Sequence, residues 1–159
     1  MDEETTQRQK LVIIGGGAVG MAVATHTRRH GNYSVKVISK DTHTAYSQCG
    51  MPFVLGGEIK DFDALIVRSP EFFERMGINI RLNTTVNAID IDPKTIYVDD
   101  EILSFDKLVI ATGSRTHIPD NIKPNIKLDN VFTLRTLSDG IKIQNALKTT
   151  EHLTIIRSG

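Results

Sequence analysis

The sequence predicts an α/β fold with a parallel β-sheet and a small antiparallel β-meander. The first observation behind this prediction is an apolar run at 10–14, a helical pattern and a second apolar run at 34–39, in that order. The second is a group of short alternating segments between 85 and 105, which polar turns separate. Continuous apolar strands are typical of parallel sheets buried on both faces, whereas alternating strands are typical of antiparallel sheets.

The amino-terminal part is predicted to form a βαβ unit. Its first strand covers 10–14, and a glycine-rich turn at 15–20 leads into a helix. Gly31 ends that helix, and the second strand follows at 34–39. Because a right-handed crossover is expected between parallel strands, this unit corresponds to half of a Rossmann-like, dinucleotide-binding fold.

The later elements follow from the same patterns and from turn residues. A helix is predicted at 69–77, since Ser69 suits its cap, Pro70 its first turn and Gly77 its end. The other predicted elements are a strand at 78–82, the meander at 85–105, a buried strand at 107–111, a helix at 138–148 and a buried strand at 152–156.

The composition excludes a general affinity for polyanions. Lys and Arg total 19 and Asp and Glu total 19, so no overall field attracts nucleic acid or an anionic membrane. The apolar run at 11–24 imitates a signal peptide, but acidic residues precede it and glycines interrupt it. A single cysteine cannot form an intrachain disulfide, which fits a reducing cytoplasm. We expect a cytoplasmic protein with no metal site.

The motif Gly15-x-Gly17-x-x-Gly20 is the first candidate site. In a dinucleotide-binding turn, Gly15 permits the tight turn, Gly17 lets the backbone approach a pyrophosphate, and Gly20 lets the helix pack closely on the sheet. The alternative is a glycine-rich corner that binds nothing. The cofactor-binding residues expected here are Gly15, Gly17, Ala18, Val19 and Gly20.

The end of the second strand departs from the usual pattern. Dinucleotide-binding folds place an acidic residue there, which hydrogen-bonds the adenosine ribose. This chain has Ser39 at that position, followed by Lys40, and Asp41 is expected to point elsewhere. Since a hydroxyl cannot grip both ribose hydroxyls as a carboxylate does, we expect Ser39 and Lys40 to line the cofactor site and to bind it more weakly.

The segment 47–53, Ser-Gln-Cys-Gly-Met-Pro-Phe, contains the second candidate site. Cys49 is predicted to stand at a helix start, where unpaired backbone N–H groups favour a thiolate. Gly50 leaves room for a flat ring, and Pro52 suits a first helical turn. The alternative is that Cys49 is a buried small hydrophobe, as free cysteines often are.

The order of the glycine motif, the cysteine segment, the meander and the tripeptide at 111–113 resembles the pyridine nucleotide-disulfide oxidoreductases. Within that family it resembles the single-cysteine branch: coenzyme A disulfide reductases, persulfide reductases and NADH oxidases. The resemblance implies FAD as the cofactor, NAD(P)H as a cosubstrate of the complete family enzyme, and Cys49 as the redox nucleophile. It also implies that the flavin lies beside Ala111, Thr112 and Gly113, and that Ser39 replaces the family's usual Glu.

The resemblance extends to the substrate. It implies that His26, Arg29 and Gln48 hold the coenzyme A moiety, together with the positions of Ala22 and Ala45. The expected substrate is therefore a small-molecule disulfide or a coenzyme A derivative. From the residues alone, the basic cluster with Arg28 is equally well explained as a solvated helix end that complements the helix dipole.

The resemblance also implies segments that follow the chain in a complete reductase. We expect 1–150 to be an incomplete FAD-binding domain without its carboxyl-terminal return segment, and 151–159 to begin a truncated NAD(P)H-binding domain in which Arg157 stands where the second glycine turn starts. Unpaired sheet edges predict self-association or pairing with a complementing chain. Two function classes stay open: the flavin part of a redox enzyme, expected to be inactive alone, or a non-catalytic nucleotide-binding or interaction fragment.

Overall fold

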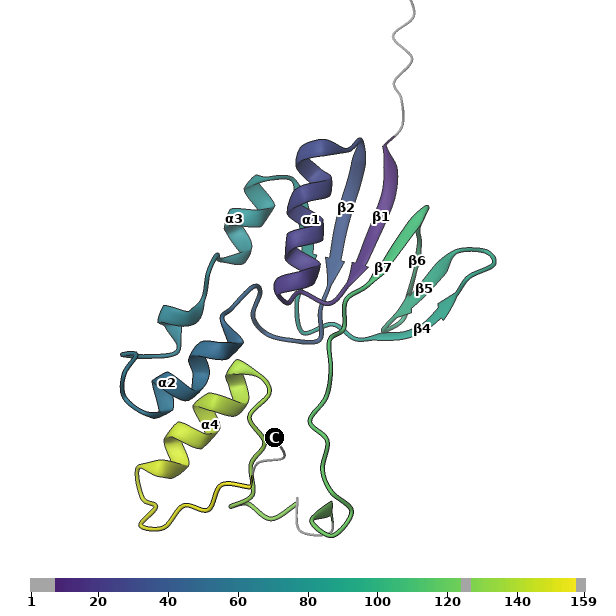
Figure 1. The fold of residues 1–159 in the computed structure, drawn as a ribbon. Helices are drawn as coiled ribbons and strands as arrows, with labels where there is room; N and C mark the ends of the chain where they lie inside the picture. The colour runs from purple at the N-terminus through teal and green to yellow at the C-terminus, as the bar shows by residue number, and fades with distance from the viewer. Residues whose placement is uncertain (1–7, 124–126, 157–159) are drawn as a thin grey trace, which may run out of the picture. The chain divides into compact units, whose positions relative to one another are not determined.

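The computed structural model describes residues 8–123 and 127–156. It divides into two compact units, each built from two stretches of chain, and each is described by itself. The first unit comprises Met1–Ser47 and Ile66–Ser114, and the second comprises Gln48–Leu65 and Arg115–Gly159. Both β-sheets belong to the first unit (Figure 1).

The first unit is organised around a four-stranded parallel sheet with the strand order β3-β2-β1-β7. Its strands are β1 (Gln9–Ile14), β2 (Tyr33–Ile38), β3 (Ile78–Arg81) and β7 (Lys107–Ile110). Ile14, the last residue of β1, pairs with Ile38 of β2 and Ile110 of β7. The carboxyl ends of these three strands are therefore level, and the turns that follow them meet at one edge of the sheet. This is the edge at which open α/β sheets bind ligands.

Two helices cover one face of the parallel sheet (Figure 1). Helix α1 (Ala18–His30) inserts Met21 and Ala24, and helix α3 (Pro70–Arg75) inserts Phe73. The apolar strand residues that form this core with them are Leu11, Ile13, Val35, Val37 and Ile78. Because α1 follows β1 directly, this packing fixes the start of α1 at the carboxyl edge of the sheet.

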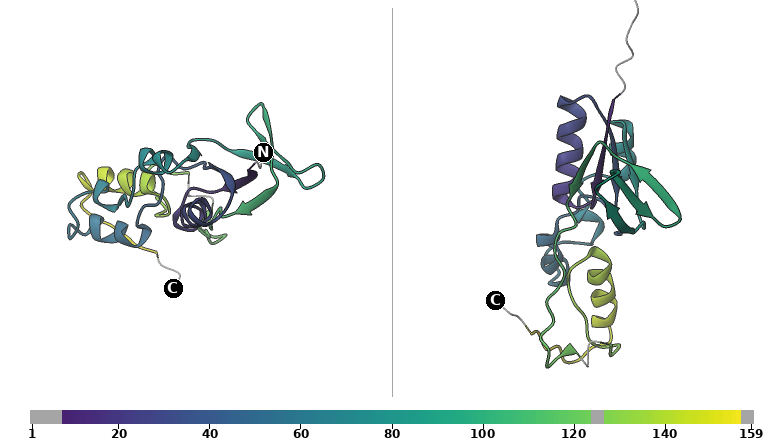
Figure 2. Two further views of the ribbon diagram at one scale, coloured as in Figure 1. Left: turned by 90° about the horizontal axis from the view of Figure 1, so that it is seen from above. Right: turned by 90° about the vertical axis from the view of Figure 1, so that its right-hand side faces the viewer.

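A three-stranded antiparallel meander covers the other face (Figure 2). Its strands are β4 (Val86–Asp90), β5 (Thr95–Val98) and β6 (Glu101–Ser104). Strand β5 alternates as its sequence predicts, since Ile96 and Val98 are buried against Val12, Ile14 and Ile38, whereas Tyr97 is exposed. The first unit is thus a three-layer α/β arrangement, which confirms the predicted fold class.

The second unit is small and mostly helical. It contains the 3-10 turns η1 (Gln48–Gly50) and η2 (Asp63–Leu65) and the helices α2 (Met51–Leu55) and α4 (Leu137–Leu147). A reciprocal capping box starts α4: the Asp139 N–H donates to Thr136 Oγ1 at 3.2 Å, and the Thr136 N–H donates to Asp139 Oδ2 at 2.8 Å. Gly140 packs against the ring of Phe62, because a Cβ at 140 would lie 2.7 Å from Phe62 Cζ.

The predicted strand at 152–156 is wrong. These residues form no strand and are exposed, with Ile155 79% exposed. An apolar run becomes a strand only where a sheet edge pairs with it, and no described strand pairs with 152–156. The other predicted elements are present with boundaries shifted by one or two residues, α4 being capped by Thr136 rather than starting at Ser138. Within the described ranges, no helix combines the length and apolar character that crossing a membrane requires.

Candidate nucleotide-binding and thiol sites

The turn after β1 can be made only with glycine at position 15. Gly15 has a φ of +113°, and a Cβ there would overlap the Ala111 carbonyl oxygen and lie 3.2 Å from the Thr112 nitrogen. The Gly15 N–H donates to the Ile38 carbonyl oxygen at 2.8 Å, and the Ala111 N–H donates to the Ile14 carbonyl oxygen at 2.8 Å. The structure therefore brings two predicted cofactor segments, the glycine turn and 111–113, into direct contact.

Gly20 and Gly17 differ in what a side chain would meet. A Cβ on Gly20 would overlap the Gly15 carbonyl oxygen and lie 3.0 Å from the Gly15 carbonyl carbon, so glycine there is a packing requirement. A Cβ on Gly17 would meet no heavy atom within 4 Å. Gly17 also has an ordinary φ of −73°, so neither packing nor backbone strain requires glycine at this position. Gly15 thus lies in the tight turn, Gly17 borders open space, and Gly20 lies at the close contact between helix and turn.

The amino-terminal end of α1 is open to an anion. Gly17 is its N-cap residue, no side chain caps it, and its first turn, which includes Ala18 and Val19, has no acidic residue. The first N–H groups of a helix lack intrahelical partners and carry the positive end of the helix dipole. Open space at Gly17 in front of these N–H groups suits a pyrophosphate, whose oxygens would accept their hydrogen bonds.

Ser39 lies at the carboxyl end of β2 beside the glycine turn. It is 5% exposed, and its Oγ accepts a hydrogen bond from the Asp41 N–H at 3.3 Å. A Cβ on Gly16 would lie 3.0 Å from Ser39 Cβ, so the absence of a side chain at 16 makes room for the serine. Lys40, the next residue, is exposed.

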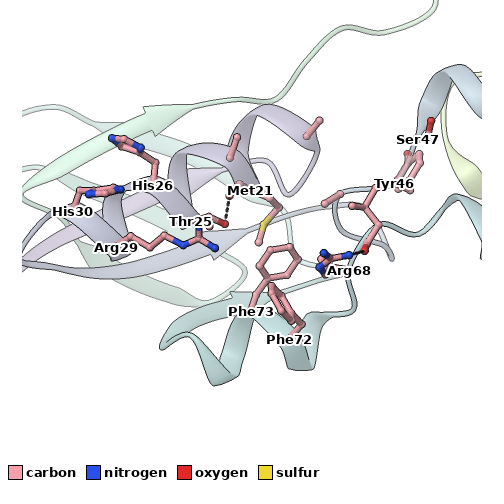
Figure 3. A pocket seen from close by; sticks show the side chains of 14 residues that line it. Met21, Thr25, His26, Arg29, His30, Tyr46, Ser47, Arg68, Phe72 and Phe73 are labelled. Carbon is pink, nitrogen blue, oxygen red and sulfur yellow. Dashed lines mark hydrogen bonds between the residues drawn. The ribbon is translucent and has the colours of Figure 1, made fainter.

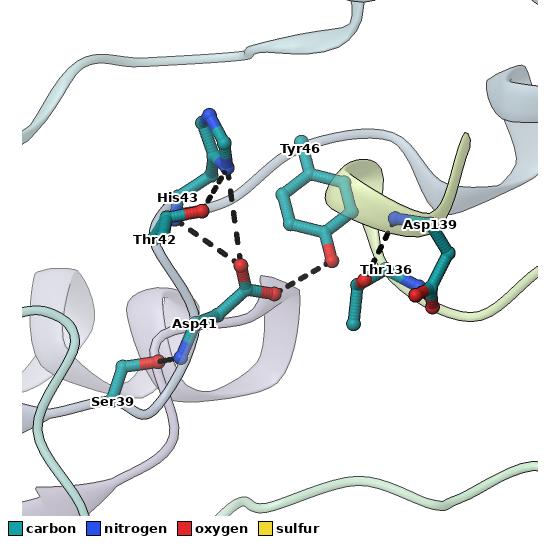
Figure 4. A network of polar contacts seen from close by, with 7 residues as sticks. All are labelled: Ser39, Asp41, Thr42, His43, Tyr46, Thr136 and Asp139. Carbon is teal, nitrogen blue, oxygen red and sulfur yellow. Dashed lines mark hydrogen bonds and ion pairs between the residues drawn. The ribbon is translucent and has the colours of Figure 1, made fainter. Parts of the chain in front are cut away.

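The backbone N–H of Asp41 bonds to Ser39, but hydrogen bonds to other residues direct its carboxylate away from Ser39 (Figure 4). Its Oδ2 accepts a hydrogen bond from Tyr46 Oη at 2.8 Å, and its Oδ1 accepts one from the His43 N–H at 3.3 Å. Thr42 Oγ1 and His43 Nδ1 form a further hydrogen bond of 2.7 Å. The Asp41 carboxylate therefore points elsewhere, which is the orientation predicted from the sequence, and it does not replace the missing acidic residue.

A cavity of about 660 Å³ lies in the first unit, between α1, the segment 45–47 and the segment 67–73 (Figure 3). The residues that line it are Ala18, Met21, Ala22, Thr25, His26, Arg29, His30, Ala45, Tyr46, Ser47, Val67, Arg68, Phe72 and Phe73. Among the predicted substrate residues, His26 and Arg29 share this cavity with Ala22 and Ala45. Gln48 belongs to the second unit, where it is exposed in η1.

The cavity is basic on one side and aromatic on another (Figure 3). Arg29 projects from α1, and the rings of His26 and His30 lie beside it with centroids 4.7 Å apart. Arg68 Cζ lies 5.2 Å from the centroid of the Phe72 ring, a cation–π contact. This combination suits a ligand that carries negative charge and a flat group.

Sequence reasoning missed Tyr46, Arg68 and Phe72. The four-residue spacing of Arg68 and Phe72 at the start of α3 could have indicated that these two side chains lie close together. It could not have indicated that they lie beside α1, because that depends on the fold. Arg28 points elsewhere than Arg29, because its Nε is buried without a hydrogen-bond partner and lies 2.9 Å from where a Gly77 Cβ would be. The basic cluster at the end of α1 is thus divided between a packed residue and a cavity residue.

Cys49 lies in η1, immediately before α2, and its thiol is free and exposed. The predicted helix start is confirmed, with Pro52 in the first turn of α2. The alternative of a buried small hydrophobe is wrong for this residue. In residues 8–123 and 127–156, no three or more His, Cys, Asp or Glu side chains cluster in a way that could hold a metal ion.

Comparison with known proteins identifies the family of this chain. The family model described as pyridine nucleotide-disulphide oxidoreductase matches residues 9–159. The NADH oxidase of Methanocaldococcus jannaschii is 35% identical over 139 residues, which cover 82% of this chain and 30% of the oxidase. The NAD(P)H coenzyme A polysulfide/persulfide reductase of Pyrococcus horikoshii is 31% identical over 160 residues, covering 96% of this chain and 35% of the reductase.

Solved structures give the same result. The NAD-dependent persulfide reductase of A. fulgidus superposes with a TM-score of 0.80 at 30% identity, covering 87% of this chain and 28% of the reductase. The water-forming NADH oxidase of Lactobacillus brevis, bound to NADH, has a TM-score of 0.80 at 27% identity, covering 89% of this chain and 32% of the oxidase.

The chain spans 30–35% of the length of these curated relatives. FAD is the cofactor of the family, and the open space at Gly17, before the uncapped start of α1, suits a pyrophosphate. This chain belongs to the pyridine nucleotide-disulphide oxidoreductase family.

Proposed function

We propose that this chain is the FAD-binding part of an NAD(P)H-dependent oxidoreductase that acts on disulfides, persulfides or oxygen, with Cys49 as its redox nucleophile. The open position at Gly17, between a strained Gly15 and a packed Gly20, is the observation that carries the proposal. In domain terms, 1–150 is the FAD-binding region and 151–159 begins the NAD(P)H-binding region. Arg157, which would stand at the second glycine turn, lies outside the described residues.

The cofactor residues have separate tasks in this proposal. Gly17, Ala18 and Val19 present backbone N–H groups to the pyrophosphate, and α1 adds its dipole. Ala111, Thr112 and Gly113 border the turn; Gly113 has a φ of +69°, which bends the chain directly after β7. FAD supplies the capacity to accept a hydride and pass two electrons to sulfur.

Cys49 performs thiol–disulfide exchange. Its thiolate attacks one sulfur of a disulfide substrate, the substrate S–S bond breaks, a mixed disulfide forms at Cys49, and the other half leaves as a thiolate. Exposure of Cys49 in η1 gives a substrate access to the sulfur. A free thiol of this kind also suits a reducing compartment such as the cytoplasm.

The substrate class follows from the cavity and from the relatives. Relatives named for coenzyme A disulfide and coenzyme A persulfide support a coenzyme A derivative. Arg29 and His26 would bind the phosphates of such a ligand, and the ring of Phe72 offers an aromatic surface on which its adenine would stack. In the second unit, Gln48 directly precedes Cys49 in η1 and is proposed separately as a residue that contacts the disulfide substrate.

Hydride transfer requires a nicotinamide held against the flavin, which is the task of the NAD(P)H-binding region that is proposed to begin at 151–159. The edge strand β7, with Ile110 63% exposed, favours association with a second copy or a complementing chain.

Mass spectrometry tests the thiol chemistry. Coenzyme A disulfide should add one coenzyme A moiety to Cys49 and release one coenzyme A thiol, several-fold faster than bis(2-hydroxyethyl) disulfide reacts. Gln48→Ala should reduce this preference, and Cys49→Ser should abolish the modification. Equal rates for the two disulfides, or no modification, would contradict the proposed role and favour a non-catalytic nucleotide-binding module.

A further inference from the structure

We propose that the end of β2 makes this nucleotide site permissive for a 2′-phosphate, so that the chain binds a 2′-phosphorylated ADP group at least as tightly as ADP itself. The inference rests on the proposed nucleotide site and concerns which adenosine nucleotides it accepts. The residues proposed to determine this preference are Ser39 and Lys40, whereas the carboxylate of Asp41 has other partners.

The acidic residue of a dinucleotide-binding fold has two effects. Its carboxylate accepts hydrogen bonds from the ribose hydroxyls, and it repels a phosphate on the 2′-oxygen. Ser39 exerts no such repulsion, because a hydroxyl is neutral, and its single oxygen cannot bind both ribose hydroxyls as a carboxylate does. Loss of the carboxylate therefore weakens binding of the unphosphorylated ribose and removes the penalty against a phosphorylated one.

Ser39 is also already committed within the protein. Its Oγ accepts the Asp41 N–H at 3.3 Å, it is only 5% exposed, and its Cβ faces Gly16. The serine thus stabilises the loop that follows β2. A ribose bound at this edge of the sheet would therefore contact the loop after β2, and no acidic side chain would be placed to bind the ribose hydroxyls.

The neighbouring carboxylates both have partners of their own. Asp41 accepts hydrogen bonds from Tyr46 Oη at 2.8 Å and from the His43 N–H at 3.3 Å, which hold it away from Ser39 (Figure 4). On the adjacent strand, Arg81 pairs with Glu101 at 2.6 Å. Neither carboxylate takes the position of the missing acidic side chain beside the glycine turn.

Lys40 supplies a positive charge at this end of β2. Lys40 is exposed, and no described residue forms an ion pair with it. Helix α1 contributes its positive end, without an acidic residue in its first turn. A lysine beside a neutral residue is the arrangement that accommodates a 2′-phosphate, since an ammonium is a compact charge that pairs with phosphate oxygens.

Calorimetric titration of the full chain with 5′-ADP and with 2′-phosphoadenosine 5′-diphosphate, which differs from 5′-ADP only by the 2′-phosphate, tests the proposal. We expect the 2′-phosphorylated nucleotide to bind with a Kd equal to or lower than that of 5′-ADP. Ser39→Glu should shift the ratio of the two Kd values by about tenfold or more in favour of 5′-ADP, because it restores both the hydroxyl acceptor and the repulsion. Lys40→Ala should shift the ratio in the same direction by a smaller factor.

Two controls make the result specific. Gln9→Glu adds the same charge at the opposite end of the sheet, since Gln9 pairs with Tyr33 at the start of β2, and it should leave the ratio unchanged. Ser39→Gln has the length of glutamate without its charge and should not produce the full shift. Retained binding of 5′-ADP by Ser39→Glu shows that the variant is folded; if it fails to fold, the wild-type ratio decides.

The outcomes are distinguishable. A wild-type preference for 5′-ADP of about tenfold or more would overturn the proposal while leaving the nucleotide site intact. A ratio that Ser39→Glu leaves unchanged in a folded protein would overturn the assignment to Ser39. Failure of both nucleotides to bind would contradict the proposed function itself.

Discussion

The glycine turn and the cysteine segment are fixed by different forces. At Gly15 and Gly20, the backbone of the protein itself excludes any side chain, because an added Cβ would overlap a carbonyl oxygen. At Cys49 the side chain is exposed, and its thiol is free. Packing therefore requires glycine at these two positions of the turn whether or not the turn binds a ligand, whereas the exposed position 49 has no comparable packing requirement for cysteine. Evidence for function must therefore come from positions that packing leaves free.

The largest effect that the comparison predicts is at Gly20. Gly20→Ala should destabilise the protein by at least about 2 kcal/mol, because the added methyl group forces α1 away from the Gly15 carbonyl. The matched control is Gly17→Ala, where the methyl group meets nothing within 4 Å and stability should change by less than about 0.5 kcal/mol. Urea unfolding followed by circular dichroism measures both; equal losses would show that the close approach of Gly20 to the Gly15 carbonyl does not decide stability.

A smaller effect is predicted in the second unit, where the neighbour is a side chain instead of backbone. Gly140→Ala should destabilise the protein by about 1–2 kcal/mol, although Ala normally favours a helix, because the methyl group would lie 2.7 Å from Phe62 Cζ. Gly56→Ala is the control: its nearest atom is 3.4 Å away and its φ is −78°, so it should be neutral or stabilising by up to about 1 kcal/mol. A stabilised Gly140→Ala in thermal melts would refute the tight contact with Phe62.

The smallest predicted effect is electrostatic and lies at α3. A hydrogen bond from Ser69 lowers the pKa of Glu71, with further lowering by the backbone and by Arg75. A lowered carboxyl pKa means that the stabilisation is present above the ordinary value and is lost as pH falls through the lowered value. Ser69→Ala should therefore raise the pKa of Glu71 in an NMR titration. An unchanged pKa would show that the hydrogen bond is absent in solution.

The fold could be predicted where local sequence and global packing agree. Continuous apolar runs gave β1 and β2, the alternation around Ile96 gave β5, and the glycine spacing gave the start of α1. Each of these signals is local, because a strand buried on both faces or a glycine-dependent turn constrains its own residues. The position of Cys49 just before a helix could be predicted for the same reason, because Pro52 is a local signal for a first helical turn.

What could not be predicted depends on residues that are distant in the sequence. Arg68 and Phe72 join α1 in the cavity only because α3 packs on the same sheet face. The run at 152–156 has the composition of a strand, yet strand formation depends on a partner edge that no local pattern encodes. The partners of Asp41 also come from folding of the loop, which places Tyr46 Oη 2.8 Å from its carboxylate.

Glycine at position 17 is expected to serve ligand binding and not the stability of the fold, and the variant Gly17→Ser separates these two roles. Serine suits an N-cap position with an extended backbone, so stability should stay within a few tenths of a kcal/mol of wild type or rise. Its side chain would occupy the space open to the pyrophosphate, so FAD affinity, measured by fluorescence titration with ADP as competitor, should fall by about tenfold or more. Saturable FAD binding by wild type and its loss in a stable Gly17→Ser protein is the predicted result. Unchanged FAD affinity in the variant, or no saturable binding by wild type, would contradict the account.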